Sequence, residues 1–128
     1  MFSFLAPKIA YRDKIGQSTW LLLHAIADHF PLDEEEGRQY EKDVVAFLTL
    51  LARLYPCENC RAHMKTYFDK CPPRFDNRAH AVRWVFNFHN EVNRQLKKPI
   101  FTPKQYADRL QQYEGVRPDG VCANCSVL

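Results

Sequence analysis

The sequence lacks a long apolar run, because charged residues interrupt the hydrophobic ones throughout its 128 residues. A membrane-spanning helix needs about 20 consecutive apolar residues, so we expect no membrane association of that kind. The net charge of +3 is weak and dispersed along the chain, which argues against a nucleic-acid partner. The apolar start, residues 1–8, lacks a basic segment and is too short for a signal peptide.

Strand signals are also missing, since no clean polar–apolar alternation and no hairpin dipeptide between apolar runs occurs. Apolar residues instead recur at intervals of three and four, which predicts helices. Prolines such as Pro31 and Pro56 end several of these stretches. The predicted helices cover residues 14–30, 38–54, 57–70, 77–96 and 103–112.

These stretches predict an all-α protein, a four-helix bundle with a short fifth helix and a flexible C-terminal tail. Asp13 is the expected N-cap of the first helix, residues 32–37 an acidic loop, and Thr102 with Gln105 a capping box before the fifth helix. We expect one domain over residues 1–113. Gly115, Pro118 and Gly120 mark residues 114–128 as the tail.

The five cysteines are the informative residues for function. Four of them form two C-x-x-C pairs, Cys57 with Cys60 and Cys122 with Cys125, while Cys71 is left over. An odd number without a secretion signal argues against a purely structural disulfide framework and favours redox or metal chemistry. Because Cys57 lies at a predicted helix start, unpaired N–H groups and the helix dipole favour its thiolate. Such a pair can exchange with other dithiols.

Two alternatives to an oxidase use the same cysteines. A zinc-binding interaction module would take its four ligands from both pairs, or from one pair with His63 and a further residue. The second pair lies about sixty residues beyond the first, farther than in a compact zinc module. We therefore predict no metal site. A flavin-free disulfide carrier needs only the two pairs, but it leaves the polar residues described next without a role.

A polar cluster lies within the apolar stripe of the fourth predicted helix. His89 and Asn93 are four residues apart and therefore share one helix face. Buried polar side chains need hydrogen-bond partners, which a planar polar ligand can supply. Lys97 and Lys98 close the segment; a solvated helix end is the simpler interpretation for them, and a contact with phosphate is the alternative.

The first predicted helix carries a third pattern, Gly16-x-x-x-Trp20-x-x-Leu23-His24. Trp20, Leu23 and Phe30 fall on one stripe, with His24 beside it. Taken alone, the pattern is sufficiently explained by an amphipathic helix with an aromatic core residue. Gly16 permits the close approach of another backbone or of a ligand.

Together and in this order, the three patterns resemble the Erv/ALR family of FAD-linked sulfhydryl oxidases. The family pattern is G-x-x-x-W-x-x-L-H, an aromatic-Pro pair, Y-P-C-x-x-C and H-N-x-V-N-x-x-L-x-K. This sequence matches it at Gly16, Trp20, Leu23, His24, Phe30, Pro31, Tyr55, Pro56, Cys57, Cys60, His89, Asn90, Val92, Asn93, Leu96 and Lys98. Each motif is weak alone, but their ordered sum across residues 13–101 is specific.

The resemblance implies a bundle that holds FAD, with Cys60 next to the flavin and Cys57 attacked by the incoming dithiol. It implies protein thiols as substrates and molecular oxygen as the acceptor, which yields hydrogen peroxide. The cofactor contacts that it implies are Gly16, Trp20, His24, His89, Asn90, Asn93, Lys97 and Lys98. It also implies that Cys122 and Cys125 shuttle electrons, since a tether raises their effective concentration at Cys57. A pair that only pins the tail is the alternative.

One departure concerns Cys71. Cellular members of the family usually have a Phe-Asp-Cys stretch that supplies its disulfide partner, whereas this sequence reads Phe101-Thr102-Pro103. We therefore expect Cys71 to be a buried free thiol, with an intermolecular link as the alternative.

This departure and the compact length resemble the oxidases of large DNA viruses. Viral relatives act in the cytoplasm of the infected cell, or in the virion, and cellular ones in the mitochondrial intermembrane space or the secretory pathway; the sequence carries no address that decides between them. The resemblance further implies a homodimer through the first two helices. Tyr40, Val44 and Phe47 serve either that face or the core.

Overall fold

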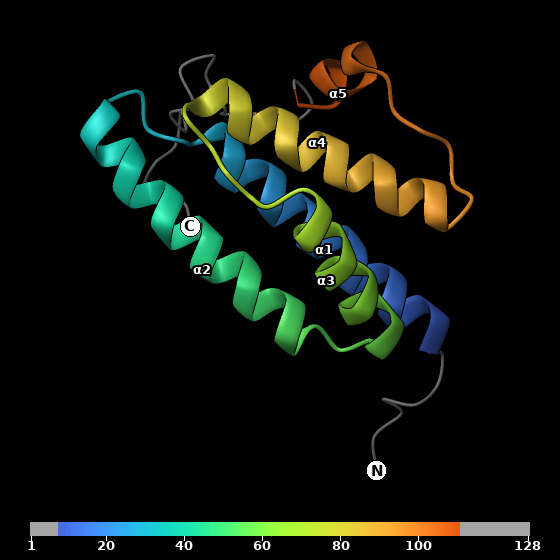
Figure 1. The fold of residues 1–128 in the computed structure, drawn as a ribbon. Helices are drawn as coiled ribbons and strands as arrows, with labels where there is room; N and C mark the ends of the chain where they lie inside the picture. The colour runs from blue at the N-terminus through green and yellow to red at the C-terminus, as the bar shows by residue number, and fades with distance from the viewer. Residues whose placement is uncertain (1–7, 111–128) are drawn as a thin grey trace.

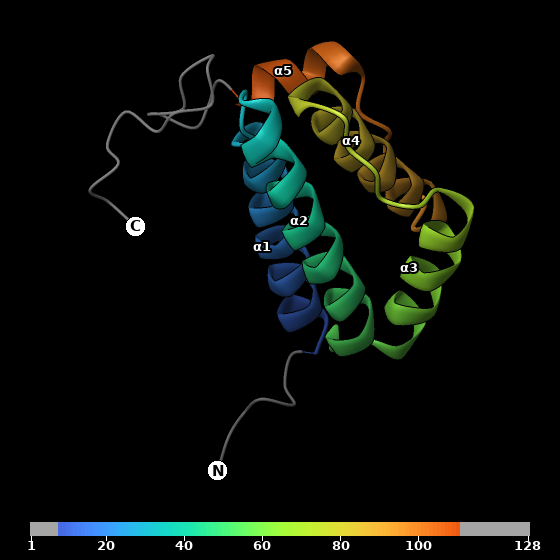
Figure 2. The same cartoon turned by 60° about the vertical axis from the view of Figure 1, so that its left-hand side comes forward.

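The computed structural model describes residues 8–110, which form five α-helices and no strand. The helices are α1 (Lys8–Asp28), α2 (Glu34–Leu54), α3 (Glu58–Lys70), α4 (Arg78–Gln95) and α5 (Pro103–Leu110). The four long helices pack as a bundle, and α5 lies across the end at which α4 begins (Figures 1 and 2). The predicted all-α bundle with a short fifth helix is confirmed. The predicted tail, with Cys122 and Cys125, lies outside the described residues.

Polar side chains cap the N-termini of α2, α4 and α5. Asp33 Oδ1 accepts a hydrogen bond from the Glu36 N–H at 2.9 Å, and Asn77 caps α4 in the same way. Thr102 Oγ1 accepts from the Gln105 N–H at 3.1 Å, while Gln105 Oε1 accepts from the Thr102 N–H at 2.9 Å. This reciprocal pair is the predicted capping box, and each cap satisfies an N–H group that the helix itself leaves unpaired.

Two of the predicted helix starts are wrong. α1 begins at Lys8, so Asp13 lies inside the helix rather than at its N-cap. α2 begins at Glu34, so most of the expected acidic loop, residues 32–37, is the first turn of a helix. Negative side chains are stabilised at a helix N-terminus by the macrodipole, which explains why this acidic run is helical.

The apolar core fills the space between the long helices. Phe30, Leu23 and Leu48 are its most completely buried side chains, and the Phe30 ring packs edge-on against Phe75 at 6.3 Å between centroids. Burial of such a side chain contributes about 2–3 kcal/mol relative to exposure. Leu96, a residue of the family pattern, is 57% exposed because it follows the last residue of α4. Within residues 8–110, no helix combines the length and apolarity that crossing a membrane requires.

The buried polar residues gather where α1 meets α4. They are His24 from α1 and His89, Asn90 and Asn93 from α4. α1 packs mainly against α4, whereas α2 packs mainly against α3. The first half of α4 buries only apolar residues such as Val85. The interface of α1 and α4 is therefore apolar where α4 begins and polar where α4 ends.

Candidate functional site

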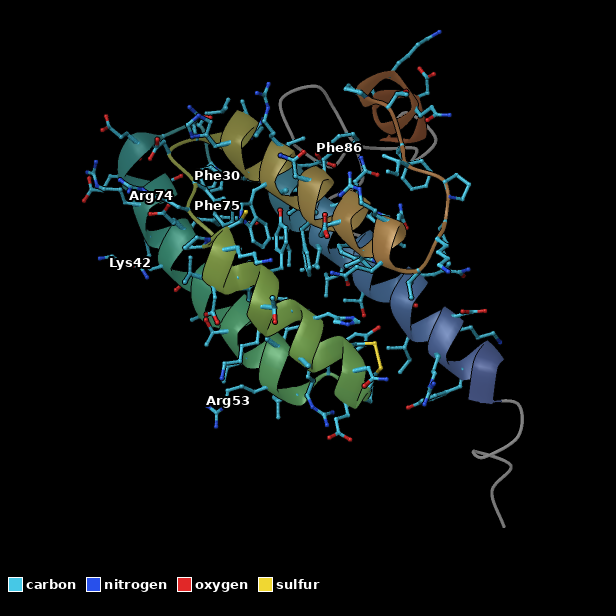
Figure 3. All side chains as sticks on the ribbon, turned by 45° about the vertical axis from the view of Figure 1, so that its right-hand side comes forward. Phe30, Lys42, Arg53, Arg74, Phe75 and Phe86 are labelled. Carbon is cyan, nitrogen blue, oxygen red and sulfur yellow. A yellow bond between two sulfur atoms is a disulfide. The ribbon has the colours of Figure 1, made fainter. Side chains whose placement is uncertain are left out.

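Cys57 and Cys60 form a disulfide at the beginning of α3, drawn as a yellow bond in Figure 3. Cys57 is the N-cap residue, and its Sγ accepts a hydrogen bond from the Cys60 N–H at 3.3 Å. Both cysteines are half-buried, and Cys60 packs against the apolar core. The unpaired N–H groups and the dipole of α3 favour a thiolate here once the disulfide is reduced. The pair thus has the surroundings of a reactive disulfide.

Tyr55, the C-cap residue of α2, fixes the turn before this disulfide. Its N–H donates to the Leu51 carbonyl at 2.8 Å, and its carbonyl accepts from the Cys57 N–H at 2.8 Å. Its hydroxyl lies 3.7 Å from where a Cβ on Gly16 would stand. Burial raises the pKa of Tyr55, and a hydrogen bond with Thr19 acts in the opposite direction. Gly16 therefore faces the turn that carries the disulfide.

His24, His89 and Trp20 form a compact cluster between α1 and α4. His24 Nε2 and His89 Nδ1 share a hydrogen bond of 2.9 Å, in which one nitrogen donates and the other accepts. The Trp20 ring stacks on His89 with centroids 4.1 Å apart and an angle of 8° between the planes. Flat aromatic surfaces with a few polar edges are typical of sites for small planar ligands.

Asn90 uses its side chain to hold the chain that follows α4. Its Nδ2 donates to the Phe101 carbonyl at 2.9 Å, and its Oδ1 accepts from the Phe101 N–H at 2.9 Å. The Phe101 ring then contacts His89 edge-on, with centroids 5.4 Å apart. The amide of Asn90 thus positions Phe101 beside the His89 cluster. The direct cofactor contact of Asn90 stays a prediction.

Asn93 differs from Asn90, because its buried Nδ2 has no hydrogen-bond partner among the described residues. An unsatisfied buried group of this kind costs about 1–3 kcal/mol, so it is typical of a place that serves a ligand or water. The backbone carbonyl of Asn93, in contrast, accepts a hydrogen bond from the Lys98 N–H at 2.8 Å. The side-chain amide of Asn93 is the best candidate in the cluster for a polar contact with a ligand.

The end of α4 adopts a Schellman motif. Lys97 has a left-handed φ of 57°, its N–H donates to the Arg94 carbonyl at 3.2 Å, and the Lys98 N–H bonds to Asn93 as described. Both lysine side chains are exposed. Two cations therefore stand just beyond the helix turn that carries Asn93, where they are available to a phosphate group.

Cys71 is exposed at the C-cap of α3, so the prediction that it is buried is wrong. The physical reason is its place after the last turn of α3, where the chain leaves the helix for Pro72 and Pro73. Trp84 Nε1 donates to its carbonyl at 3.2 Å. Burial raises the pKa of Tyr67 to about 12, and the charge of Cys71 and a hydrogen bond with it add to the effect.

The described part of the chain supplies no zinc site by itself. No three side chains of His, Cys, Asp or Glu in residues 8–110 are grouped to hold a metal ion. Structural zinc needs four ligands, and Cys57 and Cys60 are joined to each other. The hypothesis of a zinc module therefore gains no support from these residues.

Two residues near the disulfide and the His89 cluster, Phe101 and Arg61, were not predicted from the sequence. Phe101 carried no signal, because its contact with Asn90 depends on how the chain returns after α4. Arg61 carried a weak one, since it is a cation four residues after Cys57 and therefore on the same side of a helix.

A helical bundle with a disulfide at a helix N-terminus and a buried aromatic and amide cluster defines a helical protein of the thiol–disulfide redox class. The chain belongs to the Erv1 / Alr family, whose model matches residues 17–112. The match covers α2, α3, α4, α5 and most of α1.

Named relatives come from plants, fungi and a virus. The FAD-linked sulfhydryl oxidase ERV1 of Oryza sativa subsp. japonica is 39% identical over 90 residues, which are 70% of this chain and 45% of that protein. The mitochondrial FAD-linked sulfhydryl oxidase erv1 of Schizosaccharomyces pombe is 31% identical over 108 residues, 83% of this chain and 58% of that protein. The FAD-linked sulfhydryl oxidase of African swine fever virus is 29% identical over 97 residues, with 76% and 80% covered. The chain thus spans about half the length of the plant and fission-yeast relatives.

Solved structures agree with the family assignment. The yeast Erv1 core superposes with a TM-score of 0.70 at 29% identity, covering 79% of this chain and 84% of that one. The FAD binding domain of Erv1 from Saccharomyces cerevisiae gives a TM-score of 0.66 at 29% identity, with 77% and 92% covered.

Proposed function

We propose that this protein is an FAD-linked thiol oxidase, which forms disulfides in protein dithiols and reduces oxygen to hydrogen peroxide. The observation that carries the proposal is the Cys57–Cys60 disulfide, half-buried at a helix N-terminus and packed on the core of the bundle. Membership of the Erv1 / Alr family and relatives named FAD-linked sulfhydryl oxidases support it.

The residues of the polar cluster fit FAD. The buried amide of Asn93, whose Nδ2 has no partner among the described residues, suits a polar edge of the cofactor. The rings of Trp20, His24 and His89 offer flat surfaces, and Lys97 and Lys98 suit its phosphates. Gly16 would leave room at the edge of the site, and Asn90 would act there directly or by holding Phe101. When bound, FAD supplies a two-electron acceptor that returns the electrons to oxygen.

The chain's own thiols carry the exchange with the substrate. A substrate thiolate attacks Cys57 Sγ, a mixed disulfide forms, and the Cys57–Cys60 bond breaks with Cys60 leaving as a thiolate. A second substrate thiolate attacks the substrate sulfur and releases Cys57, so the substrate is oxidised and the pair is reduced. Cys60 suits the inner position because it packs against the core. Stabilisation of charge at the N-cap of α3 favours the second step, in which Cys57 is released as a thiolate.

The second pair extends the proposal. We propose that Cys122 and Cys125 pass electrons from protein substrates to Cys57, because a tethered dithiol has a high effective concentration. Replacement of Cys122 by Ser should spare oxidation of small dithiols and slow that of protein substrates. Equal losses on both substrates would contradict the shuttle.

We also propose a homodimer through α1 and α2. Tyr40 and Val44 pack against the core, whereas Phe47 is exposed. Other large apolar side chains exposed on these two helices are Tyr11, Leu21, Leu22, Leu50 and Leu54. Sedimentation of the purified protein at twice the mass of one chain would support the dimer, and sedimentation as a monomer at micromolar concentration would oppose it. The compartment that we propose depends on the origin of the protein. A cellular protein would act in the mitochondrial intermembrane space or the secretory pathway, and a viral one in the cytoplasm of the infected cell or in the virion.

The oxidase proposal is tested by the purified protein itself. We expect a yellow protein that absorbs near roughly 450 nm and converts dithiothreitol and oxygen into peroxide. Cys60→Ser should lower this rate about a hundredfold or more, since no disulfide remains to exchange. Cys71→Ser is the matched control and should retain the rate. A colourless protein that consumes no oxygen, or zinc bound in stoichiometric amount, would overturn the proposal.

A further inference from the structure

Arg61 is bound to both sides of the turn that carries the redox disulfide. Its backbone N–H donates to the Cys57 carbonyl at 2.9 Å, which is an ordinary bond of the first turn of α3. Its side chain reaches back, and Nη1 donates to the Tyr55 carbonyl at 2.6 Å. That same oxygen accepts the Cys57 N–H at 2.8 Å, so the guanidinium and the Cys57 amide share one acceptor.

This contact is more specific than a surface charge. Arg61 is half-buried, and a hydrogen bond from a charged donor to a carbonyl contributes more than one between neutral groups. A guanidinium stays protonated at every working pH and presents its donors in a rigid plane. Its charge is therefore the same whether the sulfur of Cys57 is oxidised or reduced.

The charged groups that lie close in sequence to Cys57, or to Gly16 on the facing helix, are exposed. They are Glu58 and His63 on α3, Arg12, Asp13 and Lys14 on α1, and Arg53 on α2. Water screens exposed charges strongly, so their influence on a half-buried sulfur is small. Arg61 is the cation that the structure ties to the Cys57 turn by a hydrogen bond.

We propose that Arg61 is a positioning residue for the Cys57–Cys60 pair. By binding the Tyr55 carbonyl it fixes the turn, and it keeps a permanent positive charge beside the thiols when the disulfide is reduced. This charge adds to that of the α3 N-terminus and increases the thiolate fraction of the pair. The inference rests on the proposed redox role of this disulfide, but its test requires neither a cofactor nor oxygen.

The test measures thiol reactivity in the full chain with Cys71, Cys122 and Cys125 replaced by Ser. The protein is reduced, and alkylation of the remaining pair by iodoacetamide is followed as a function of pH without oxygen. Arg61→Gln should raise the midpoint of the profile by about 0.5–1 pH unit. Arg61→Lys keeps the charge without the planar donors and should give a smaller rise.

Arg53→Gln is the matched control, since it removes the same charge from an exposed residue that points away from the bundle (Figure 3). Its alkylation profile should coincide with that of the parent. Circular dichroism checks that each variant is folded, and Arg61→Met, which keeps the aliphatic stem, replaces the glutamine variant if that one unfolds. A folded Arg61 variant whose profile coincides with the parent overturns the inference, even where the oxidase proposal holds.

Discussion

The two ends of the region where α1 and the residues that follow it pack against α4 hold different chemistry. At the apolar end, Phe30 and Val85 are buried among other hydrocarbon side chains. At the polar end, His24, His89 and Asn93 are buried at a comparable depth, with exposures of 5–7%. Burial of polar groups costs free energy unless they are satisfied, so the polar end is built at the expense of stability. The apolar end thus maintains the fold, and the polar end is where the proposed function places the cofactor.

The largest expected effect lies at the apolar end. Phe30→Ala should lower the free energy of unfolding by about 3–5 kcal/mol, because it removes a fully buried ring and leaves a cavity. Urea denaturation followed by circular dichroism measures the loss. Activity per folded molecule should hardly change, and a selective loss of activity in the folded variant would break the division between the two ends.

At the polar end we expect the opposite result, a loss of cofactor binding with little change in stability. Asn93→Ala removes a buried Nδ2 that no described group satisfies, and this gain offsets the packing lost with the side chain, so the stability of the protein without cofactor should change by less than about 1 kcal/mol. The affinity for FAD should fall about tenfold, measured by fluorescence titration. Asn90→Ala is the contrasting variant, since it breaks two bonds to Phe101 and should destabilise the protein. An Asn93 variant that is strongly destabilised yet binds FAD normally would reverse the assignment.

A substitution at Lys97, at the polar end, should have a smaller effect than Phe30→Ala and Asn93→Ala. Lys97→Gly should raise the stability of the cofactor-free protein by about 0.5–1 kcal/mol, because glycine adopts the left-handed conformation of this position without strain. The same change removes a cation, so FAD binding should weaken and become less sensitive to salt. Lys98→Gly is the control, with weaker binding and no gain in stability. Unchanged stability in Lys97→Gly would show that the motif is not strained.

The smallest effect concerns Tyr67, whose ring stacks on Phe88 with centroids 5.1 Å apart. Its pKa is raised from 10.0 to about 12, so the unfolded chain ionises first. The stability that the neutral phenol contributes is complete below pH 10 and is lost as the pH rises towards 12. Tyr67→Phe should therefore flatten the alkaline decline in stability, measured by urea denaturation from pH 9 to 11. An identical decline in the variant would refute this origin.

Local signals in the sequence predicted the helices better than their ends. The capping box of Thr102 and Gln105 is confirmed, because both partners lie three residues apart. The start of α1 was misplaced because a good cap residue, Asp13, lies within a helix that begins earlier. The start of α2 was misplaced because an acidic run is typical both of a loop and of the first turn of a helix.

The site was predictable only in part. Helical periodicity placed His89 on an inward face and His24 beside one, but the bond between rings 65 residues apart depends on how α1 and α4 pack. The bonds from Asn90 to Phe101 and from Arg61 to Tyr55 depend on where the backbone turns after a helix, which side-chain spacing does not encode. The exposure of Cys71 has the same origin.

The sulfur of Cys57 is also the group that closes the open end of α3. A disulfide sulfur is neutral and a weak acceptor, whereas a thiolate is charged and attracts the free N–H groups of a helix end strongly. If the protein acts as the proposed oxidase, each cycle of reduction and reoxidation therefore changes the strength of this N-cap hydrogen bond. We expect the amide proton of Cys60 to exchange with solvent more slowly in the reduced protein, so that α3 registers the oxidation state of its own first residues.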